Sequence, residues 1–263
     1  MKNLKNTVIK SVSGVALPGF VLLAFLFLWE IAVIVTKIEK WILPRPSAIF
    51  MTLAEMRGTI AGHTMQTMTE AVLGLLIAIT AGVLIAILID ASDLVRKSIE
   101  PLLVLSQTIP IIALAPLLII WFGFGIFPKV IVVALVCFFP IAINLSDGFR
   151  LVDRDMVKLM KTLGASRRQM FLKLKLPAAT PFFFSGLKIA GTYSVMGAVI
   201  GEWLGASQGL GILLTRSSQS FLTEKVFATI ILIVGLSLII FAIIELLARV
   251  MMPWKYKQDK YSN

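Results

Sequence analysis

Few residues in this chain could do covalent or metal chemistry. Its 263 residues include one cysteine, Cys137, and one histidine, His63. That leaves almost no ligand set for a metal ion, and a lone cysteine excludes an internal disulfide. We find no convincing nucleophile–base pair and no G-x-x-x-x-G-K-[ST] phosphate loop. The sequence therefore predicts no catalytic residue, no metal site and no bound cofactor, with Cys137 packed in an apolar run and His63 in an outer loop.

Ionisable residues inside apolar runs are the first candidates for a role in transport. Charges are costly in a bilayer, so such residues usually serve a function or pair with one another. Glu30, Glu70, Lys188 and Glu245 are of this kind. Glu70 and Glu245 lie near the ends of their runs, where snorkelling or pairing would explain them. Lys188 lies deeper and could snorkel, pair with a carboxylate or attract an anionic substrate.

Other polar side chains in the apolar runs could line a path for a solute. Hydrogen bonds between helices would explain most of them equally well. The residues that we predict for a substrate pathway are Gln107, Asn144, Lys188, Tyr193, Ser194 and Glu202.

Membrane-spanning helices must position these residues. The chain is 58% hydrophobic and 15% charged, whereas soluble domains average about 45–50% and about 25%. Crossing a bilayer takes about 20 apolar residues, and six runs come close to that length, so we expect an all-α integral membrane protein with about six transmembrane helices. One membrane domain would occupy residues 1–263, with a polar tail at 255–263. The six runs are Leu17–Val35, Thr64–Ile89, Leu102–Phe122, Val130–Leu145, Ala179–Ile200 and Val226–Val250.

The basic residues indicate how these spans are oriented. Cytoplasmic loops carry an excess of Lys and Arg. With the N-terminus inside, most of the Lys and Arg residues fall in cytoplasmic segments, which predicts that both termini are cytoplasmic. The small residues Gly74 and Gly82 in the second span predict close packing against neighbouring helices.

The most informative segment is the long basic loop between the fourth and fifth spans, residues 150–177. Apolar residues recur there at helical spacing, and Asp153 can cap the helix. Gly164 then ends it, a second short helical piece runs through Phe171, and Pro177 precedes the next span. This pattern predicts a helical hairpin outside the bilayer. From its residues alone it could be a solvated loop that sets topology, a helix resting on anionic lipid, or a docking element for a cytoplasmic partner.

The order of short motifs along nearly the whole chain resembles a known family. Gly164-Ala165-Ser166 followed by L-K-L-P at 174–177 is similar to the EAA loop of ABC importer permeases, and the set as a whole resembles the nitrate/sulfonate/taurine-type permeases. Where that loop has E-A-A, this chain has Lys158-Leu159-Met160, so the family's glutamate is replaced by a lysine, for which Asp153 or Asp155 could substitute. The other matching elements are Trp29–Glu30, Leu43–Pro46, Ile109–Pro110, Pro116, Trp121–Gly125, Pro181–Lys188, Glu202 and Gly209–Gly211.

The resemblance implies a type I ABC importer permease fold with a cytoplasmic coupling helix. It implies a second permease copy, two cytoplasmic ATPase subunits that bind ATP and Mg²⁺, an extracellular or periplasmic binding protein and a place in the cell membrane. Gly164, Ala165 and Ser166 would form the turn of the coupling element. The other residues that we predict for contact with the ATPase or for the frame of this loop are Leu159, Met160, Leu163, Phe171 and Pro177. Arg167 and Arg168 could instead face lipid phosphates.

The resemblance also limits the kinds of solute that we expect, and two other classes of membrane protein stay open. Glu202–Gly211 would form a re-entrant or gating loop near the binding protein, or an ordinary turn. The solute would be small and polar or anionic, like nitrate, sulfonates or taurine, or a pyrimidine precursor of thiamine. A self-sufficient channel or ion-coupled carrier is the alternative, and a membrane enzyme is disfavoured by the missing catalytic groups.

Overall fold

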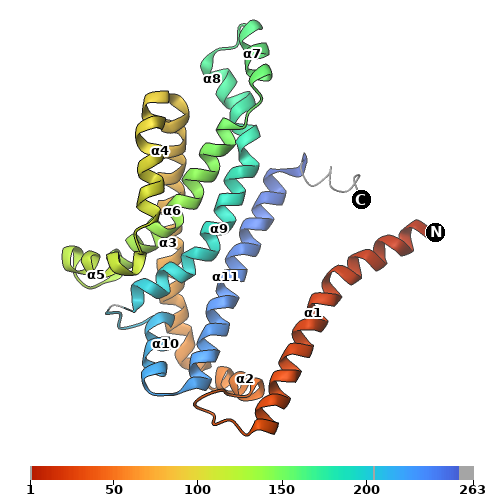
Figure 1. Cartoon of the computed structure of the whole chain (residues 1–263), viewed down its shortest axis with the longest axis vertical. Coiled ribbons are helices and arrows are strands. Elements are labelled where there is room, and N and C mark those ends of the chain that lie inside the picture. Colours follow the sequence, from red (N-terminus) through yellow and green to blue (C-terminus); the bar gives the residue numbers. More distant parts are fainter. Residues whose placement is uncertain (1, 204, 255–263) are drawn as a thin grey trace. The chain divides into compact units, whose positions relative to one another are not determined.

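The computed structural model of this protein describes residues 2–203 and 205–254, and every regular element in these ranges is a helix (Figure 1). The polar tail expected at 255–263 lies outside the described residues. The elements in chain order are α1 (Lys2–Thr36), α2 (Pro46–Glu55), α3 (Arg57–Ala91), α4 (Asp93–Gln107), α5 (Ile111–Phe122), α6 (Ile126–Arg150), α7 (Arg154–Thr162), α8 (Arg167–Met170), the π-helical segment η1 (Phe171–Lys175), α9 (Leu176–Glu202), α10 (Leu210–Gln219) and α11 (Thr223–Met251).

Five helical segments are long and apolar enough to cross a membrane. They are Leu17–Thr36, Arg57–Ala91, Ile126–Arg150, Arg167–Glu202 and Thr223–Met251. The bent pair Asp93–Ser106 and Ile111–Phe122 makes six if it counts as one span. The expectation of an all-α protein with about six spans is therefore confirmed.

The prediction of one continuous helix for the third span, 102–122, is wrong. α4 ends at Gln107, α5 begins at Ile111, and the two helices meet at an angle of 97°. Pro110 stands at the N-cap of α5 with ψ of 118°. Proline has no N–H to donate to the preceding turn, and it disfavours helical dihedrals in the residue before it. The chain therefore breaks at Ile109–Pro110, and the run of apolar residues on both sides conceals the break.

The described helices form two compact units. The described part of the first comprises residues 2–59 and 214–230. In it the Glu30 carboxylate of α1 accepts hydrogen bonds from the Ser47 backbone N–H (3.0 Å) and hydroxyl (2.8 Å) at the start of α2. The Thr223 hydroxyl donates to the Trp41 carbonyl at 2.6 Å, and the Trp29 and Phe227 rings lie 5.5 Å apart. Glu30 thus ties the Trp29–Glu30 motif to the segment that follows Leu43–Pro46.

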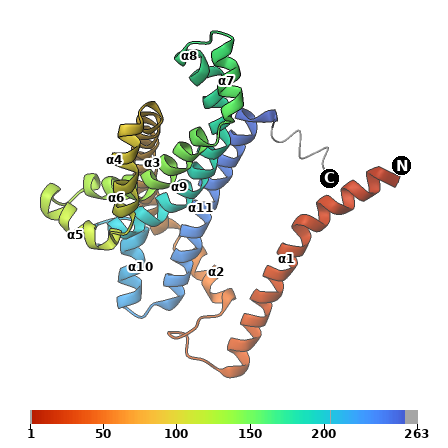
Figure 2. The ribbon, with the colours of Figure 1, turned by 45° about the horizontal axis from the view of Figure 1, so that its top comes forward.

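The described part of the second unit comprises residues 60–203, 205–213 and 231–254 and contains the main core. Figures 1 and 2 show α6 and α9 running side by side in it. Glycines permit the close approach of the helices: a Cβ on Gly186 of α9 would meet the Pro140 carbonyl of α6, and one on Gly74 of α3 would meet the Val133 side chain. Gly82 lies in the same way against Ile141, so the close packing predicted for the second span is present.

Cys137 lies at the centre of this core. It is completely buried, as expected, and its thiol donates to the Ala190 carbonyl across the α6–α9 contact at 3.2 Å. Next to it, Ile240 and Ile244 of α11 pack against Gly191 of α9. Buried small and branched side chains therefore hold α3, α6, α9 and the second half of α11 together, and this frame positions the polar groups described below.

Candidate functional site

The first candidate site is the hairpin formed by α7, the turn at 163–166 and α8. The Asp153 side chain accepts from the Asp155 N–H at 2.8 Å, so it caps α7 as predicted. α7 ends at Thr162, and Gly164 has φ of +77°, a left-handed conformation that costs a residue with a Cβ more than it costs glycine. The predicted helix–glycine–helix geometry is therefore present.

A reciprocal capping box begins the second piece of the hairpin. The Ser166 hydroxyl accepts from the Gln169 N–H at 3.2 Å, and the Gln169 side chain accepts from the Ser166 N–H at 2.8 Å. Such boxes satisfy two backbone donors at a helix start. α8 does not end before the fifth span: through η1 it runs continuously into α9, and Pro177 lies in the first turn of α9 rather than before it.

The outer face of α7 carries apolar side chains without a partner in the described chain. Met156, Leu159 and Leu163 are 49%, 52% and 75% exposed. Positions three, four and seven apart share one face of a helix. None of these three side chains joins a hydrophobic core cluster in the described part of the chain.

Two contacts fasten the hairpin to the bundle. The Phe171 ring lies 5.5 Å from the Phe149 ring and joins a buried cluster with Leu145. The Lys175 ammonium donates to both carboxylate oxygens of Asp90 at 2.7 and 2.9 Å. Phe171, which we predicted among the contacts to an ATPase, is thus placed by the structure between the hairpin and α6.

Lys158 stands where the EAA pattern has glutamate. Its ammonium pairs with Asp155 on the same helix at 2.8 Å, with 76% and 84% of the two side chains exposed. An exposed pair of this kind contributes at most about 1 kcal/mol. Neither acidic residue near the turn is left to replace the glutamate freely, because Asp153 caps α7 and Asp155 pairs with Lys158.

The second candidate site is an open cleft of about 450 Å³ where α4, the α4–α5 break, α6 and α9 meet. Three of its lining residues offer polar groups: Ser106, Gln107 and Tyr193. The remainder are apolar, and no charged side chain lines the cleft among the described residues. The apolar lining residues are Ile109, Pro110, Ile111, Leu114, Leu135, Val136, Phe139, Pro140 and Met196.

Of the six residues predicted for the pathway, Gln107 and Tyr193 line this cleft. Asn144 donates to the Pro140 carbonyl on its own helix at 2.8 Å, and Ser194 is buried and donates to the Gly191 carbonyl. Lys188 forms an ion pair with Glu245 of α11, which is the pairing alternative left open by the sequence. The structure does not bring these three residues, or Glu202, to the cleft.

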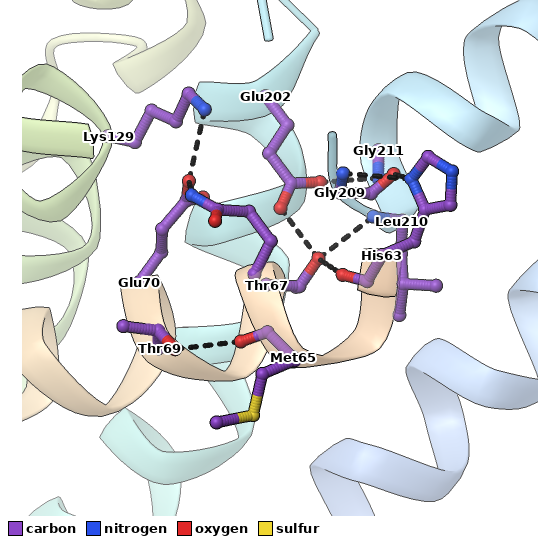
Figure 3. Close-up of polar contacts among 11 residues, drawn as sticks. His63, Met65, Thr67, Thr69, Glu70, Lys129, Glu202, Gly209, Leu210 and Gly211 are labelled. Atoms are coloured by element: carbon purple, nitrogen blue, oxygen red, sulfur yellow. Dashed lines mark hydrogen bonds and ion pairs between the residues drawn. The ribbon is translucent and has the colours of Figure 1, made fainter. Parts of the chain in front are cut away.

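A third site is a buried polar cluster that joins α3 to the start of α10 (Figure 3). Thr67, Glu70 and Glu202 are completely buried. The Thr67 hydroxyl donates to Glu202 Oε1 at 2.6 Å and accepts from the Leu210 N–H at 2.8 Å. The Gly211 N–H donates to Glu202 Oε2 at 2.5 Å. Side chains of α3 and α9 therefore satisfy two of the free N–H groups that every helix has at its start, here those of α10.

The glycines of the G-L-G motif follow from this geometry. A Cβ on Gly209 would overlap the Glu202 carboxylate, and one on Gly211 would overlap the Val199 carbonyl and crowd the same carboxylate. Gly209 also has φ of +133°, which side chains rarely permit. The motif is required because a carboxylate lies directly against the backbone at the entry to α10.

His63 and Lys129 complete the cluster. His63 lies in α3, not in an outer loop as predicted, and its Nδ1 is 3.0 Å from the Gly209 N and 2.9 Å from the Gly209 O. The Lys129 ammonium at the start of α6 donates to Glu70 Oε1 at 3.0 Å. Glu70 Oε2 has no hydrogen-bond partner in the described part of the chain. Sequence reasoning missed His63, Thr67 and Lys129, although the spacing of 63, 67 and 70 places three polar groups on one helix face.

Comparison with known proteins agrees with this architecture. A sequence profile described as "Binding-protein-dependent transport system inner membrane component" matches residues 74–252. The formylaminopyrimidine transport permease protein ThiX of Halalkalibacterium halodurans is 38% identical over 242 residues, covering 92% of this chain and 96% of ThiX. The putative aliphatic sulfonates transport permease protein SsuC of Bacillus subtilis is 30% identical, covering 92% of this chain and 87% of SsuC.

The fold also has a solved counterpart. A chain from an inward-facing structure of the MetNI methionine ABC transporter matches with a TM-score of 0.64 and 16% sequence identity. The match covers 73% of this chain and 95% of that chain. It confirms the expected all-helical ABC importer permease fold.

Proposed function

Because this chain belongs to the family of binding-protein-dependent transport system inner membrane components and is an ABC importer permease, we propose that it carries a small uncharged heteroaromatic solute, a pyrimidine of the thiamine-precursor type. The observation that carries the proposal is the chemistry of the cleft at the α4–α5 break. Its lining offers a hydroxyl, an amide and a phenol on an apolar wall, without a charged side chain among the described residues.

The size and lining of the cleft suit a small planar molecule. Its volume of about 450 Å³ lies in the range of small-molecule sites, which are mostly apolar with a few placed polar groups. Phe139 and Tyr193 can lie against a heteroaromatic ring. Gln107 can both donate to and accept from ring nitrogens and amino groups.

The cleft offers no charge that would compensate an anion such as nitrate or a sulfonate. Moving an anion out of water is costly unless a cation or several donors compensate it. Lys188 is paired with Glu245, and Lys129 is paired with Glu70. The lysines of α6 and α9, two of the helices that line the cleft, are thus already neutralised. The same surroundings admit an uncharged heterocycle without such a cost.

Uptake into proteoliposomes tests this proposal. The chain, reconstituted with an ATPase and a binding protein that co-purify with it, should import a labelled formylaminopyrimidine. A tenfold excess of unlabelled pyrimidine should compete with this import, and taurine and nitrate should not. Tyr193→Ala should lower uptake at least tenfold, whereas Ile189→Ala, at an exposed residue of the same helix that does not line the cleft, should leave it unchanged. Saturable import of taurine but not of pyrimidine would refute the substrate and leave the permease role intact. Movement of solute without any ATPase would instead indicate a channel or carrier.

We further propose how the importer is assembled around this chain. Importer permeases of this family work with ATPase and substrate-binding partners. ATP and Mg²⁺ would bind to two separate cytoplasmic ATPases, and a second copy of this chain would close the open cleft into a pathway. Both termini would be cytoplasmic, and the binding protein would deliver solute to the opposite side.

The exposed apolar face of α7 supports the assignment of the ATPase contact. We propose that Leu159 and Leu163 become buried against the ATPase, with Met160 beside them. The Gly164–Ser166 turn would set the angle between the two helices of the hairpin. Leu159→Ser with Leu163→Ser should weaken ATPase binding at least tenfold in co-purification. The matched control is Leu151→Ser with Leu172→Ser, which removes two exposed leucines from the same region. If the control pair is as damaging as the α7 pair, α7 is not the docking face.

A further inference from the structure

A second cleft, of about 610 Å³, lies between the last turns of α3 and the inner side of the hairpin. The functions assigned above do not use it. Its lining residues are Ile87, Asp90, Ala91, Val157, Lys161, Arg167, Arg168, Met170, Phe171 and Lys175.

The charged side chains of this cleft leave an excess of positive charge. Lys175 is held by both oxygens of Asp90. Lys161, Arg167 and Arg168 have no carboxylate partner within the ranges that the structure describes. Three cations therefore face one opening. An arginine guanidinium can donate two parallel hydrogen bonds to the oxygens of one phosphate or carboxylate group.

The remainder of the lining is apolar and lies at the end of a membrane span. Ile87, Val157, Met170 and Phe171 are half-buried, and Ala91 is the last residue of α3, which is long and apolar enough to cross the bilayer. Three cations beside an apolar lining suit a ligand that carries a phosphate group on an apolar body. Inorganic phosphate and glycerol 3-phosphate offer the phosphate group but no apolar body.

The cleft and the proposed ATPase contact use opposite faces of α7. Val157 and Lys161 are four residues apart and share one face. Leu159 and Leu163 also share a face, which is displaced from the first by two residues, or about 200° around a helix of 3.6 residues per turn. A ligand in the cleft and a protein on the outer face can therefore be bound at the same time.

We propose that this basic cleft is a binding site for a phosphate group, with an anionic lipid headgroup as the expected carrier. Lys161, Arg167 and Arg168 contact the phosphate, and the apolar floor receives the first part of the acyl chains. A lipid bound there bridges α3 and the hairpin and steadies the coupling element from the side opposite to the ATPase.

The experiment measures binding of dioctanoyl phosphatidylglycerol to the full chain purified in a neutral detergent. Wild type should bind this lipid at least tenfold more tightly than dioctanoyl phosphatidylcholine. Neutralising the cleft with Lys161→Gln, Arg167→Gln and Arg168→Gln should weaken phosphatidylglycerol binding at least tenfold. The matched control, Lys97→Gln, Lys158→Gln and Lys173→Gln, removes three charges that do not line the cleft and should bind within twofold of wild type.

Inorganic phosphate and glycerol 3-phosphate distinguish the two sources of the phosphate group. Competition at micromolar concentrations would make a soluble phosphate the ligand, whereas competition only above millimolar concentrations supports the lipid. Equal binding of both lipids by wild type overturns the proposal without reliance on any variant. The proposal is also overturned if the cleft variant keeps its lipid but loses the ATPase, because the three cations then serve the partner protein.

Discussion

At the scale of single residues, the ion pair of Lys129 and Glu70 gives the most direct test of the structure. The Glu70 side chain is completely buried, and 10% of the Lys129 side chain is exposed. Removing one member of a buried pair leaves an uncompensated charge, which costs about 3–5 kcal/mol. Lys129→Met should therefore lower the free energy of unfolding by that amount, seen as a clear loss of thermal stability in detergent.

Two controls separate charge from packing at this pair. The double variant Glu70→Met with Lys129→Met should recover most of the stability, because it removes both charges. Lys158→Gln, which breaks an exposed pair, should cost less than about 1 kcal/mol. If Lys129→Met alone is as stable as wild type, Glu70 is not held as a buried anion in the folded protein.

Gly209 makes a second prediction at this scale. An added Cβ would overlap the Glu202 carboxylate, and the φ of +133° is strained for alanine. Gly209→Ala should displace the entry to α10, with a loss of about 2 kcal/mol or more from overpacking and strain.

The matched control for Gly209 is Gly235→Ala, in the middle of α11. A Cβ there meets nothing within 4 Å, and alanine is better than glycine in a helix by about 1 kcal/mol. Thermal unfolding of the two variants should therefore move in opposite directions. A shift of the same sign and size in both would show that Glu202 does not hold this segment.

At the scale of elements, the hairpin should be separable from the bundle. α7 has no buried residue, and Gly164 has open space around its missing Cβ. Gly164→Ala therefore introduces only the strain of a left-handed alanine, about 1–2 kcal/mol. We expect unchanged global unfolding, faster hydrogen exchange in α7 and ATPase binding weakened by roughly tenfold.

The same variant has a clear opposite outcome. A lower unfolding temperature with unaltered exchange in α7 would mean that the turn supports the bundle rather than the coupling element. Gly62→Ala supplies the comparison, since that glycine also has open space around it but lies in helix α3 with an ordinary negative φ.

The helices show where prediction from the sequence alone succeeds and where it fails. The capped helix at 154–162 and its glycine stop are local features, so Asp153 and Gly164 suffice to predict them. The break near Pro110 is local too, but apolar residues on both sides favoured one continuous span. A proline inside an apolar run can be accommodated in a spanning helix, as Pro140 is in α6, so its presence alone does not distinguish a kink from a break of 97°.

At the scale of the whole molecule, the proposed orientation places residues 40 and 97 on opposite sides of the membrane. Lys40 and Lys97 are exposed, and the native thiol of Cys137 is completely buried, so it should not react with a membrane-impermeant reagent. In intact cells, Lys40→Cys should be labelled at once and Lys97→Cys only after the membrane is opened. Labelling in the reverse order would place both termini outside.

The sequence by itself determined the class of this protein. Six apolar runs, the distribution of basic residues and the ordered motifs predicted an importer permease, because span length, charge and short motifs are properties of the linear chain. It also located the helical hairpin at residues 150–177, whose caps and turn depend on residues within a few positions of one another.

Only the tertiary structure decided which polar side chains work together. Tyr193 lines the cleft, whereas its neighbour Ser194 is completely buried, and nothing local distinguishes them. Glu202 meets Thr67 across 135 residues of sequence, and Lys129 meets Glu70 across 59. Helical periodicity predicts which residues share a face, but the rotation of each helix against its neighbours, set by the packing of side chains at glycine contacts, determines what that face meets.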